Sequence, residues 1–216
     1  MSGENQTLAH YDPYQVTPAA GITTGKYSII LAIGESLNPH HVSALGYERD
    51  TTPELKALLE KYHGTGRLIV SNAVSTRVAI PMLVNNLREP DNYDAYKSKA
   101  TNIFANAKKQ GYQTAFISAQ GLEGLSNWIG IHDIDLWEDT QIRPAPDVGA
   151  DVVLTPSVES AKLNWDKPFL MVLNSRAPHI PYDRNIPQGF AKFSTPKLND
   201  DVEQKKNEYD DAIRLY

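Results

Sequence analysis

The sequence predicts an α/β fold in which a mostly parallel central sheet carries helices on both faces. Short continuous apolar runs, typical of strands buried on both faces, alternate with segments whose apolar residues have helical spacing. Such alternation favours parallel pairing, because a parallel pair needs a long crossover connection. With 216 residues, 41% hydrophobic and 22% charged, the chain has the size and composition of one globular domain.

The expected elements follow from the chain in order. Residues 1–26 are polar and contain several prolines and glycines, so we expect an irregular arm or linker ahead of a domain over 27–216. Four apolar runs predict strands, at residues 27–33, 67–74, 112–119 and 168–174. Helical spacing and capping signals predict helices at residues 53–62, from about 77, 93–109, 157–163 and 202–216.

Polar clusters follow three of these predicted strands directly. They are Gly34-Glu35-Ser36, Ser75-Thr76, and Asn174-Ser175-Arg176 with His179 nearby. In parallel sheets, ligands bind beyond the carboxyl ends of the strands. The sequence therefore predicts one composite site built from these clusters.

Charge and composition exclude several classes of function. The net charge is −5, so no basic field is available for nucleic acid, and we expect no nucleic-acid partner. The chain has no cysteine, so oxygen and imidazole must hold any metal. Its apolar runs fall far short of the ~20 residues of a spanning helix. The first residues do not resemble a signal peptide, and we expect a soluble chain without a targeting signal.

One long motif makes the sequence resemble a known family. The segment at 30–59, ILAIGESLNPHHVSALGYERDTTPELKALL, is an apolar strand, then G-E-S, a histidine, and G-Y-x-R-x-T-x-P. It resembles the opening of the catalytic domain of the phosphoethanolamine transferases, in the sulfatase/alkaline-phosphatase-like superfamily. The matching residues are Gly34, Glu35, Ser36, His41, Gly46, Tyr47, Arg49, Thr51 and Pro53.

Further segments resemble the same family in the same order. They lie at 71–83, which is similar to the nucleophile segment, and at 102–120, 174–193 and 207–216. The likeness covers about residues 27–216 and implies an alkaline-phosphatase/sulfatase-like fold. In the family an Asp-His pair follows the last of these motifs, and this sequence ends before it. The resemblance therefore implies a domain that is truncated at its C-terminus.

The resemblance also implies the metal and the nucleophile. Glu35 would ligate a divalent metal, most simply zinc, and Thr76 would be both a metal ligand and the nucleophile that forms a phosphothreonine. Ser75 is the rival nucleophile. Both hydroxyls also suit the N-cap of the helix that starts near Arg77. The formylglycine signature of sulfatases does not match this segment, which argues against sulfate-ester hydrolysis.

Two further positions would meet the substrate. His179 matches a family histidine that would contact the transferred phosphoryl group or a second metal. Asn174 stands where the family has another histidine; an amide binds phosphate but is a poor metal ligand. His41 also matches the family, and we expect it to be structural.

The implied activity is metal-dependent transfer of phosphoethanolamine from phosphatidylethanolamine to lipopolysaccharide, on lipid A or a core sugar. The resemblance places the intact protein at the periplasmic face of the inner membrane, attached through a segment that this sequence lacks. As an incomplete domain, the chain is expected to bind metal weakly and to have little activity alone. The alternatives are a phosphoglycerol transferase or sulfatase-like phosphohydrolase, and a non-catalytic remnant of the fold.

Overall fold

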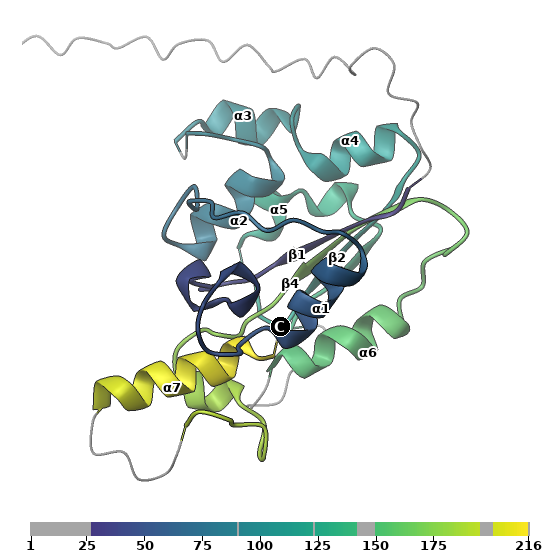
Figure 1. The fold of residues 1–216 in the computed structure, drawn as a ribbon. Coiled ribbons are helices and arrows are strands. Elements are labelled where there is room, and N and C mark those ends of the chain that lie inside the picture. The colour runs from purple at the N-terminus through teal and green to yellow at the C-terminus, as the bar shows by residue number, and fades with distance from the viewer. Residues whose placement is uncertain (1–26, 90, 123, 142–149, 195–200, 216) are drawn as a thin grey trace, which may run out of the picture.

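A parallel four-stranded sheet forms the centre of the molecule. The computed structural model describes residues 27–89, 91–122, 124–141, 150–194 and 201–215, so the predicted arm at 1–26 lies outside the described residues. The strands are parallel and lie in the order β1-β4-β2-β3; Figure 1 labels β1, β4 and β2 at the centre of the molecule. Their bounds are β1 Ile29–Ile33, β2 Gln113–Ser118, β3 Leu136–Glu138 and β4 Phe169–Asn174.

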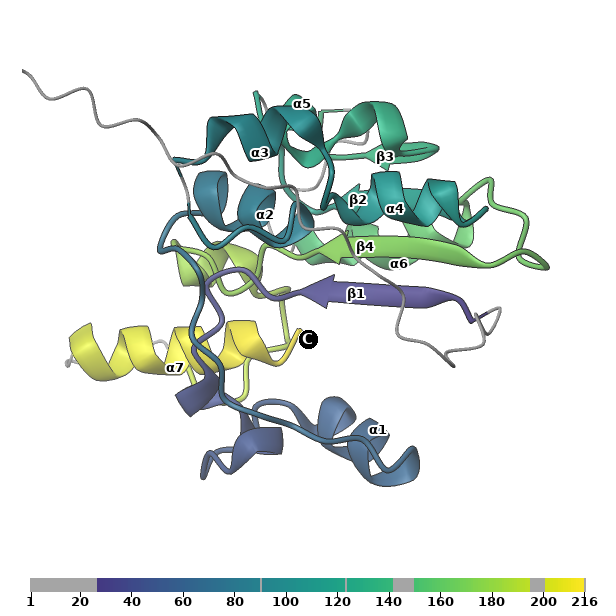
Figure 2. The ribbon, with the colours of Figure 1, turned by 90° about the horizontal axis from the view of Figure 1, so that it is seen from above.

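Helices cover both faces of this sheet, as the sequence predicts. One face packs against α2 (Thr76–Val84), α4 (Ile103–Lys109) and α5 (Ser126–Ile129), and the other against α6 (Leu154–Glu159). Figure 2 shows the remaining long helices, α1 and α7, beyond the β1 edge. Their bounds, with that of α3, are α1 Pro53–Lys61, α3 Tyr93–Ser98 and α7 Asp201–Ile213.

Alternating side chains of the two central strands build the two cores. Phe116 of β2 packs on the Phe104 ring of α4, with ring centroids 6.3 Å apart, in the core beneath α2 and α5. Its neighbours Ala115 and Ile117 belong to the opposite core, beneath α6. Because side chains alternate along a strand, a continuous apolar run is what a strand with two covered faces requires.

The prediction that the first strand is buried on both faces is wrong. β1 pairs with β4 along one side, and no other described strand pairs with it. It is thus an edge strand in this structure, and Ile29 and Ile30 are 50% and 57% exposed. The apolar run identified a strand correctly, but its position in the sheet depends on partners that the run does not specify.

The strand predicted at 67–74 is also wrong. These residues form no strand, and their apolar side chains are exposed, with Ile69 at 82% and Val70 at 96%. A β-strand needs a partner for its backbone hydrogen bonds. None of the described strands pairs with this segment, so an apolar composition alone does not make it one.

The helix predicted at 93–109 is two helices. Lys99 has φ 54°, a left-handed conformation that ends α3, and Asn102 begins α4. The Asn102 side chain accepts hydrogen bonds from the backbone N–H groups of Phe104 and Ala105, which is an N-cap. The structure also contains β3 and α5, which the sequence did not predict.

No helix within the described ranges has the length and apolar character needed to span a membrane.

Candidate functional site

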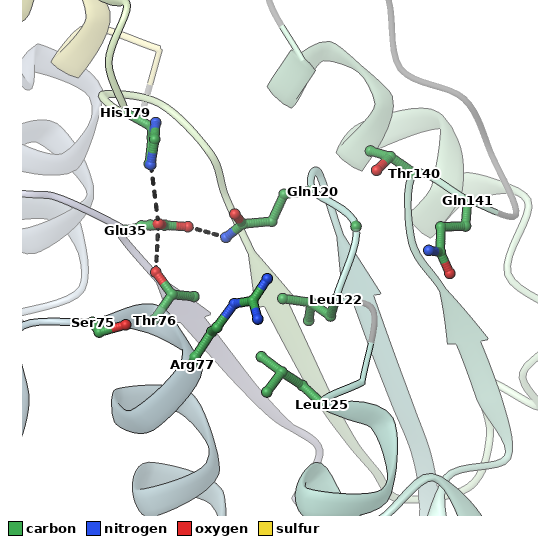
Figure 3. A pocket seen from close by; sticks show the side chains of 11 residues that line it. Glu35, Ser75, Thr76, Arg77, Gln120, Leu122, Leu125, Thr140, Gln141 and His179 are labelled. Carbon is green, nitrogen blue, oxygen red and sulfur yellow. Dashed lines mark hydrogen bonds and ion pairs between the residues drawn. The ribbon is translucent and has the colours of Figure 1, made fainter.

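Residues from all three polar clusters lie together beyond the carboxyl ends of β1 and β4, although Ser75 and Thr76 follow no strand. They surround a cavity of about 520 Å³, which Figure 3 shows from close by. The first two clusters and the loop after β4 all contribute to its wall. The lining residues are Glu35, Ser75, Thr76, Arg77, Gln120, Gly121, Leu122, Leu125, Thr140, Gln141 and His179.

Glu35 lies at the centre of the polar contacts. It follows β1 in a tight turn, and its side chain is only 9% exposed. One carboxylate oxygen, Oε1, accepts a hydrogen bond from the Thr76 hydroxyl at 2.5 Å, and the other, Oε2, accepts one from the Gln120 side-chain amide. Figure 3 shows these contacts converging on the carboxylate. Two elements far apart in the sequence thus orient one carboxylate.

Thr76 is the first residue of α2, and Ser75 is its N-cap residue. The Ser75 side chain makes no capping hydrogen bond, and the Thr76 hydroxyl points to Glu35. The capping role considered for these hydroxyls is therefore not what the structure shows. The N–H groups and dipole of a helix N-terminus favour a negatively charged group, so the Thr76 hydroxyl faces a region suited to phosphate.

His179 faces Glu35 from the loop after β4. Its Nδ1 atom lies 2.6 Å from the carbonyl oxygen of Ile180. Because a carbonyl oxygen can only accept a hydrogen bond, Nδ1 carries the hydrogen and donates this bond. In the neutral ring the lone pair is then on Nε2, which lies 3.8 Å from Oε1 of Glu35. The imidazole nitrogen and the carboxylate oxygen are both donor atoms that a metal cation between them can use.

Asp151 fixes the loop that carries His179. Its carboxylate accepts hydrogen bonds from the backbone N–H groups of Arg176 at 2.6 Å and Ala177 at 2.9 Å. Burial raises the pKa of Asp151 above its usual value, and these two hydrogen bonds oppose the shift. Sequence analysis did not single out Asp151, because no motif connects it with a loop some 25 residues away.

Asn174, predicted to bind substrate, is not among the residues that line the cavity. It is the last residue of β4 and is fully buried. Its side-chain amide donates to the hydroxyl of Ser118 at 2.9 Å, at the end of the neighbouring strand β2. The structure therefore brings Glu35, Thr76 and His179 together and leaves Asn174 between two strand ends.

Sequence analysis missed other members of the cavity wall. Gln120 is the last residue of the 102–120 segment that resembles the family, and it follows a predicted strand, so the sequence could have indicated it. Arg77 is adjacent to Thr76 and lines the same cavity. Thr140 and Gln141 follow β3, a strand that was not predicted, so nothing in the sequence placed them here.

Helix α7 supports the segment that follows Glu35. Asp210 is fully buried and accepts hydrogen bonds from the Tyr47 hydroxyl at 2.9 Å and from Arg49 at 2.9 Å. His41 Nδ1 lies 2.6 Å from the same carboxylate. His41 is thus held by Asp210 and is not part of the cavity wall.

Two tyrosines of this region are expected to ionise late. Burial, with the Asp210 carboxylate beside it, raises the pKa of Tyr47 to about 12, and burial raises the pKa of Tyr209 to about 12. The unfolded chain loses these protons near pH 10, before the folded chain does. Stability is therefore unaffected by these groups below pH 10 and falls between pH 10 and 12. Spectrophotometric titration at 295 nm checks this, and Tyr209→Phe should remove one late-titrating group; a profile identical to that of the wild type would contradict it.

Two curated relatives of this chain are phosphoethanolamine transferases. Phosphoethanolamine transferase EptC of Escherichia coli (strain K12) is 28% identical over 207 residues, covering 86% of this chain and 34% of the relative. Phosphoethanolamine transferase CptA of Salmonella typhimurium (strain LT2) is 30% identical over 207 residues, with the same coverage. The chain thus spans about a third of the length of these relatives.

Solved structures show the same fold. The C-terminal periplasmic domain of EcEptC from Escherichia coli, in complex with Zn, aligns with a TM-score of 0.69 and 22% identity. The match covers 88% of this chain and 56% of that one. The soluble domain of lipooligosaccharide phosphoethanolamine transferase A from Neisseria meningitidis aligns with a TM-score of 0.62 and 19% identity, covering 88% of this chain and 58% of that one.

The family profile extends over nearly the whole described chain. The Sulfatase family matches residues 28–216, which begins just before β1 and includes every lining residue of the cavity. The chain therefore belongs to the Sulfatase family, with homology to phosphoethanolamine transferases.

Proposed function

We propose that this chain carries the phosphoryl-transfer site of a phosphoethanolamine transferase. The observation that supports it best is the contact between the Thr76 hydroxyl and Glu35, at 2.5 Å, in the wall of a cavity at the N-terminus of α2. The donor would be phosphatidylethanolamine and the acceptor lipopolysaccharide, on lipid A or a core sugar. The transferred group and the lipid A acceptor are named for homologues, and the donor and the core-sugar acceptor rest on the resemblance to the family.

Thr76 would be the nucleophile. Its Oγ1 atom would form a bond to phosphorus while the bond from phosphorus to the glycerol oxygen of the donor breaks, which leaves phosphoethanolamine on Thr76 and releases diacylglycerol. Glu35 Oε1 already accepts the hydroxyl hydrogen and would receive the proton, and the leaving oxygen would be protonated in turn. In the second half-reaction an acceptor oxygen would take the phosphoethanolamine and return Thr76 to its hydroxyl form.

A divalent metal fits the donor atoms of this site. Glu35 and Thr76 offer oxygen and His179 offers the Nε2 lone pair, a set that suits zinc. We propose Glu35 and Thr76 as metal ligands, with His179 at the transferred group or a second cation. When bound, such a cation lowers the pKa of a coordinated hydroxyl and offsets charge on the phosphoryl oxygens. One solved relative is a Zn complex.

The described residues supply only part of a zinc site. No group of three or more histidine, aspartate or glutamate side chains among them is arranged to hold a metal ion. Catalytic zinc usually has three protein ligands. We therefore expect this chain to bind Zn²⁺ weakly, with Glu35→Gln binding less still. Isothermal titration calorimetry checks this, and a stoichiometric sub-micromolar site in the chain would contradict it.

The place of action would be the periplasmic face of the inner membrane, in a longer protein. The related solved structures include C-terminal periplasmic domains from Escherichia coli and Campylobacter jejuni, and another is an integral membrane protein from Neisseria meningitidis. The proposed donor and acceptor are both lipids. The site would therefore meet its substrates at a membrane surface.

The direct test is covalent labelling. The chain is incubated with Zn²⁺ and phosphatidylethanolamine carrying an isotopically labelled headgroup, and its peptides are analysed by mass spectrometry. We expect phosphoethanolamine on the peptide that contains Thr76, even at low turnover, because each chain needs to react only once. Absence of the label, with release of free phosphate or sulfate from simple esters instead, would favour a hydrolase.

A further inference from the structure

The turn that carries Glu35 depends on a hydroxyl from the far end of the chain. Tyr209, in α7, donates a hydrogen bond to the carbonyl oxygen of Ser36 at 2.7 Å. The same hydroxyl oxygen accepts a hydrogen bond from the backbone N–H of Asn38, also at 2.7 Å. One phenol group thus bridges the two residues that flank Leu37, directly after Glu35.

The backbone at this turn needs such support. Ser36 has φ 56°, in the left-handed region that residues other than glycine rarely adopt. Glu35 is the preceding residue, so a change of φ at Ser36 alters how the turn leaves β1 and where the carboxylate points. The hydrogen bonds from Thr76 and Gln120 act on the Glu35 carboxylate and do not hold the Ser36 backbone itself.

The ring of Tyr209 is fixed independently of its hydroxyl. It packs edge to face against His41, with centroids 5.1 Å apart, and against Tyr182, also at 5.1 Å. The adjacent Asp210 anchors α7 through its contacts with His41, Tyr47 and Arg49. Removing only the hydroxyl should therefore leave the helix and the ring in place.

We propose that Tyr209 is a positioning residue, whose hydroxyl holds the Glu35–Ser36 turn so that the Glu35 carboxylate faces Thr76. The effect of Tyr209 on phosphoryl transfer rests on the proposed function, whereas its effect on the Glu35–Ser36 turn does not. Tyr209 lies outside the cavity wall and acts only through the turn. Loss of a group that orients a ligand typically costs about 10- to 100-fold in metal affinity or activity.

The test uses a nuclear magnetic resonance signal that reports on Glu35 without metal or substrate. The Gln120 side-chain amide donates to Glu35, so its ¹H and ¹⁵N shifts respond to the position of the carboxylate. Glu35→Ala gives the shifts of the released amide. We expect Tyr209→Phe to move the Gln120 signals toward those values, and Tyr182→Phe to leave them unchanged, because the Tyr182 hydroxyl makes no hydrogen bond to another described residue.

A rescue variant separates positioning from general destabilisation. Asparagine accepts the left-handed conformation more readily than serine, and Ser36 is exposed, so Ser36→Asn has room for its side chain. In the Tyr209→Phe background, Ser36→Asn should restore the Gln120 signals. Wild-type signals in Tyr209→Phe, or altered signals that Ser36→Asn does not restore, would overturn the proposal.

A further measurement needs no variant. In the wild-type chain the backbone N–H hydrogen of Asn38 should exchange with solvent more slowly than exposed backbone N–H groups without partners, because it is donated to the Tyr209 hydroxyl. Exchange at the rate of an open amide would also overturn the proposal.

If Thr76 is labelled by the donor lipid, Tyr209→Phe should slow labelling about 10- to 100-fold at an unchanged half-saturating lipid concentration. If Thr76 is never labelled, the proposed function fails, and the Gln120 and Asn38 signals still decide the role of Tyr209.

Discussion

Replacing Thr76 by alanine is expected to abolish transfer of phosphoethanolamine onto the chain. The substitution removes the only atom at this position that can form the bond to phosphorus, and loss of a nucleophile lowers the rate on the order of a thousandfold or more. The Glu35 carboxylate keeps its contact with Gln120, so the cavity should remain formed. Mass spectrometry of the chain after incubation with labelled phosphatidylethanolamine measures the result.

Two matched variants make this prediction specific. Thr76→Ser keeps a hydroxyl on the same carbon and should retain labelling at position 76. Ser75→Ala removes the rival hydroxyl, which lines the same cavity and makes no capping hydrogen bond. This variant should be labelled like the wild type. Label on Ser75 in the wild-type chain, or undiminished labelling of Thr76→Ala, would refute the assignment.

Asp210→Ala is expected to cause the largest loss of stability. The Asp210 carboxylate is fully buried and is the shared acceptor for Tyr47 and Arg49, with His41 also bound to it. Removing the carboxylate leaves the Tyr47 hydroxyl and His41 without this acceptor and Arg49 with Glu203 as its remaining ionic partner, which costs about 3–5 kcal/mol in total. For a chain of this size that corresponds to a fall in Tm of roughly 6–20 °C. Thermal unfolding followed by circular dichroism measures it.

An exposed ion pair in the same region provides the control. Lys192 and Asp50 lie 3.1 Å apart, with side chains 45% and 54% exposed. Such surface pairs contribute little, because water screens both charges. Asp50→Asn should therefore leave Tm almost unchanged. If Asp210→Ala changed Tm no more than Asp50→Asn does, the buried network would not be what attaches α7 to the rest of the fold.

The fold class could be predicted because burial leaves a direct mark on the sequence. The strands β2 and β4 have apolar residues directed to both covered faces, and each was predicted within a residue or two of its bounds. The failures concern segments whose state depends on partners. β1 and residues 67–74 both contain consecutive apolar residues, yet one is an exposed edge strand and the other forms no strand. The apolar composition of a segment shows that it tends to be buried, but it does not identify the element that packs against it.

The sequence by itself determined the α/β class and the chemistry of the site: a carboxylate after the first strand, hydroxyls at a helix start, and an imidazole after the last strand. Position after a strand was enough for Glu35 and His179, because parallel strands bring their carboxyl ends to one edge, whereas Thr76 reaches this edge with no strand before it. Only the tertiary structure decided which of these groups meet. It turned the Thr76 hydroxyl onto Glu35, buried Asn174, added Gln120, and placed Tyr209 against the Glu35 turn. Those contacts join residues 41 to 173 positions apart, and pairings over such distances are set by three-dimensional packing, which local sequence patterns do not encode.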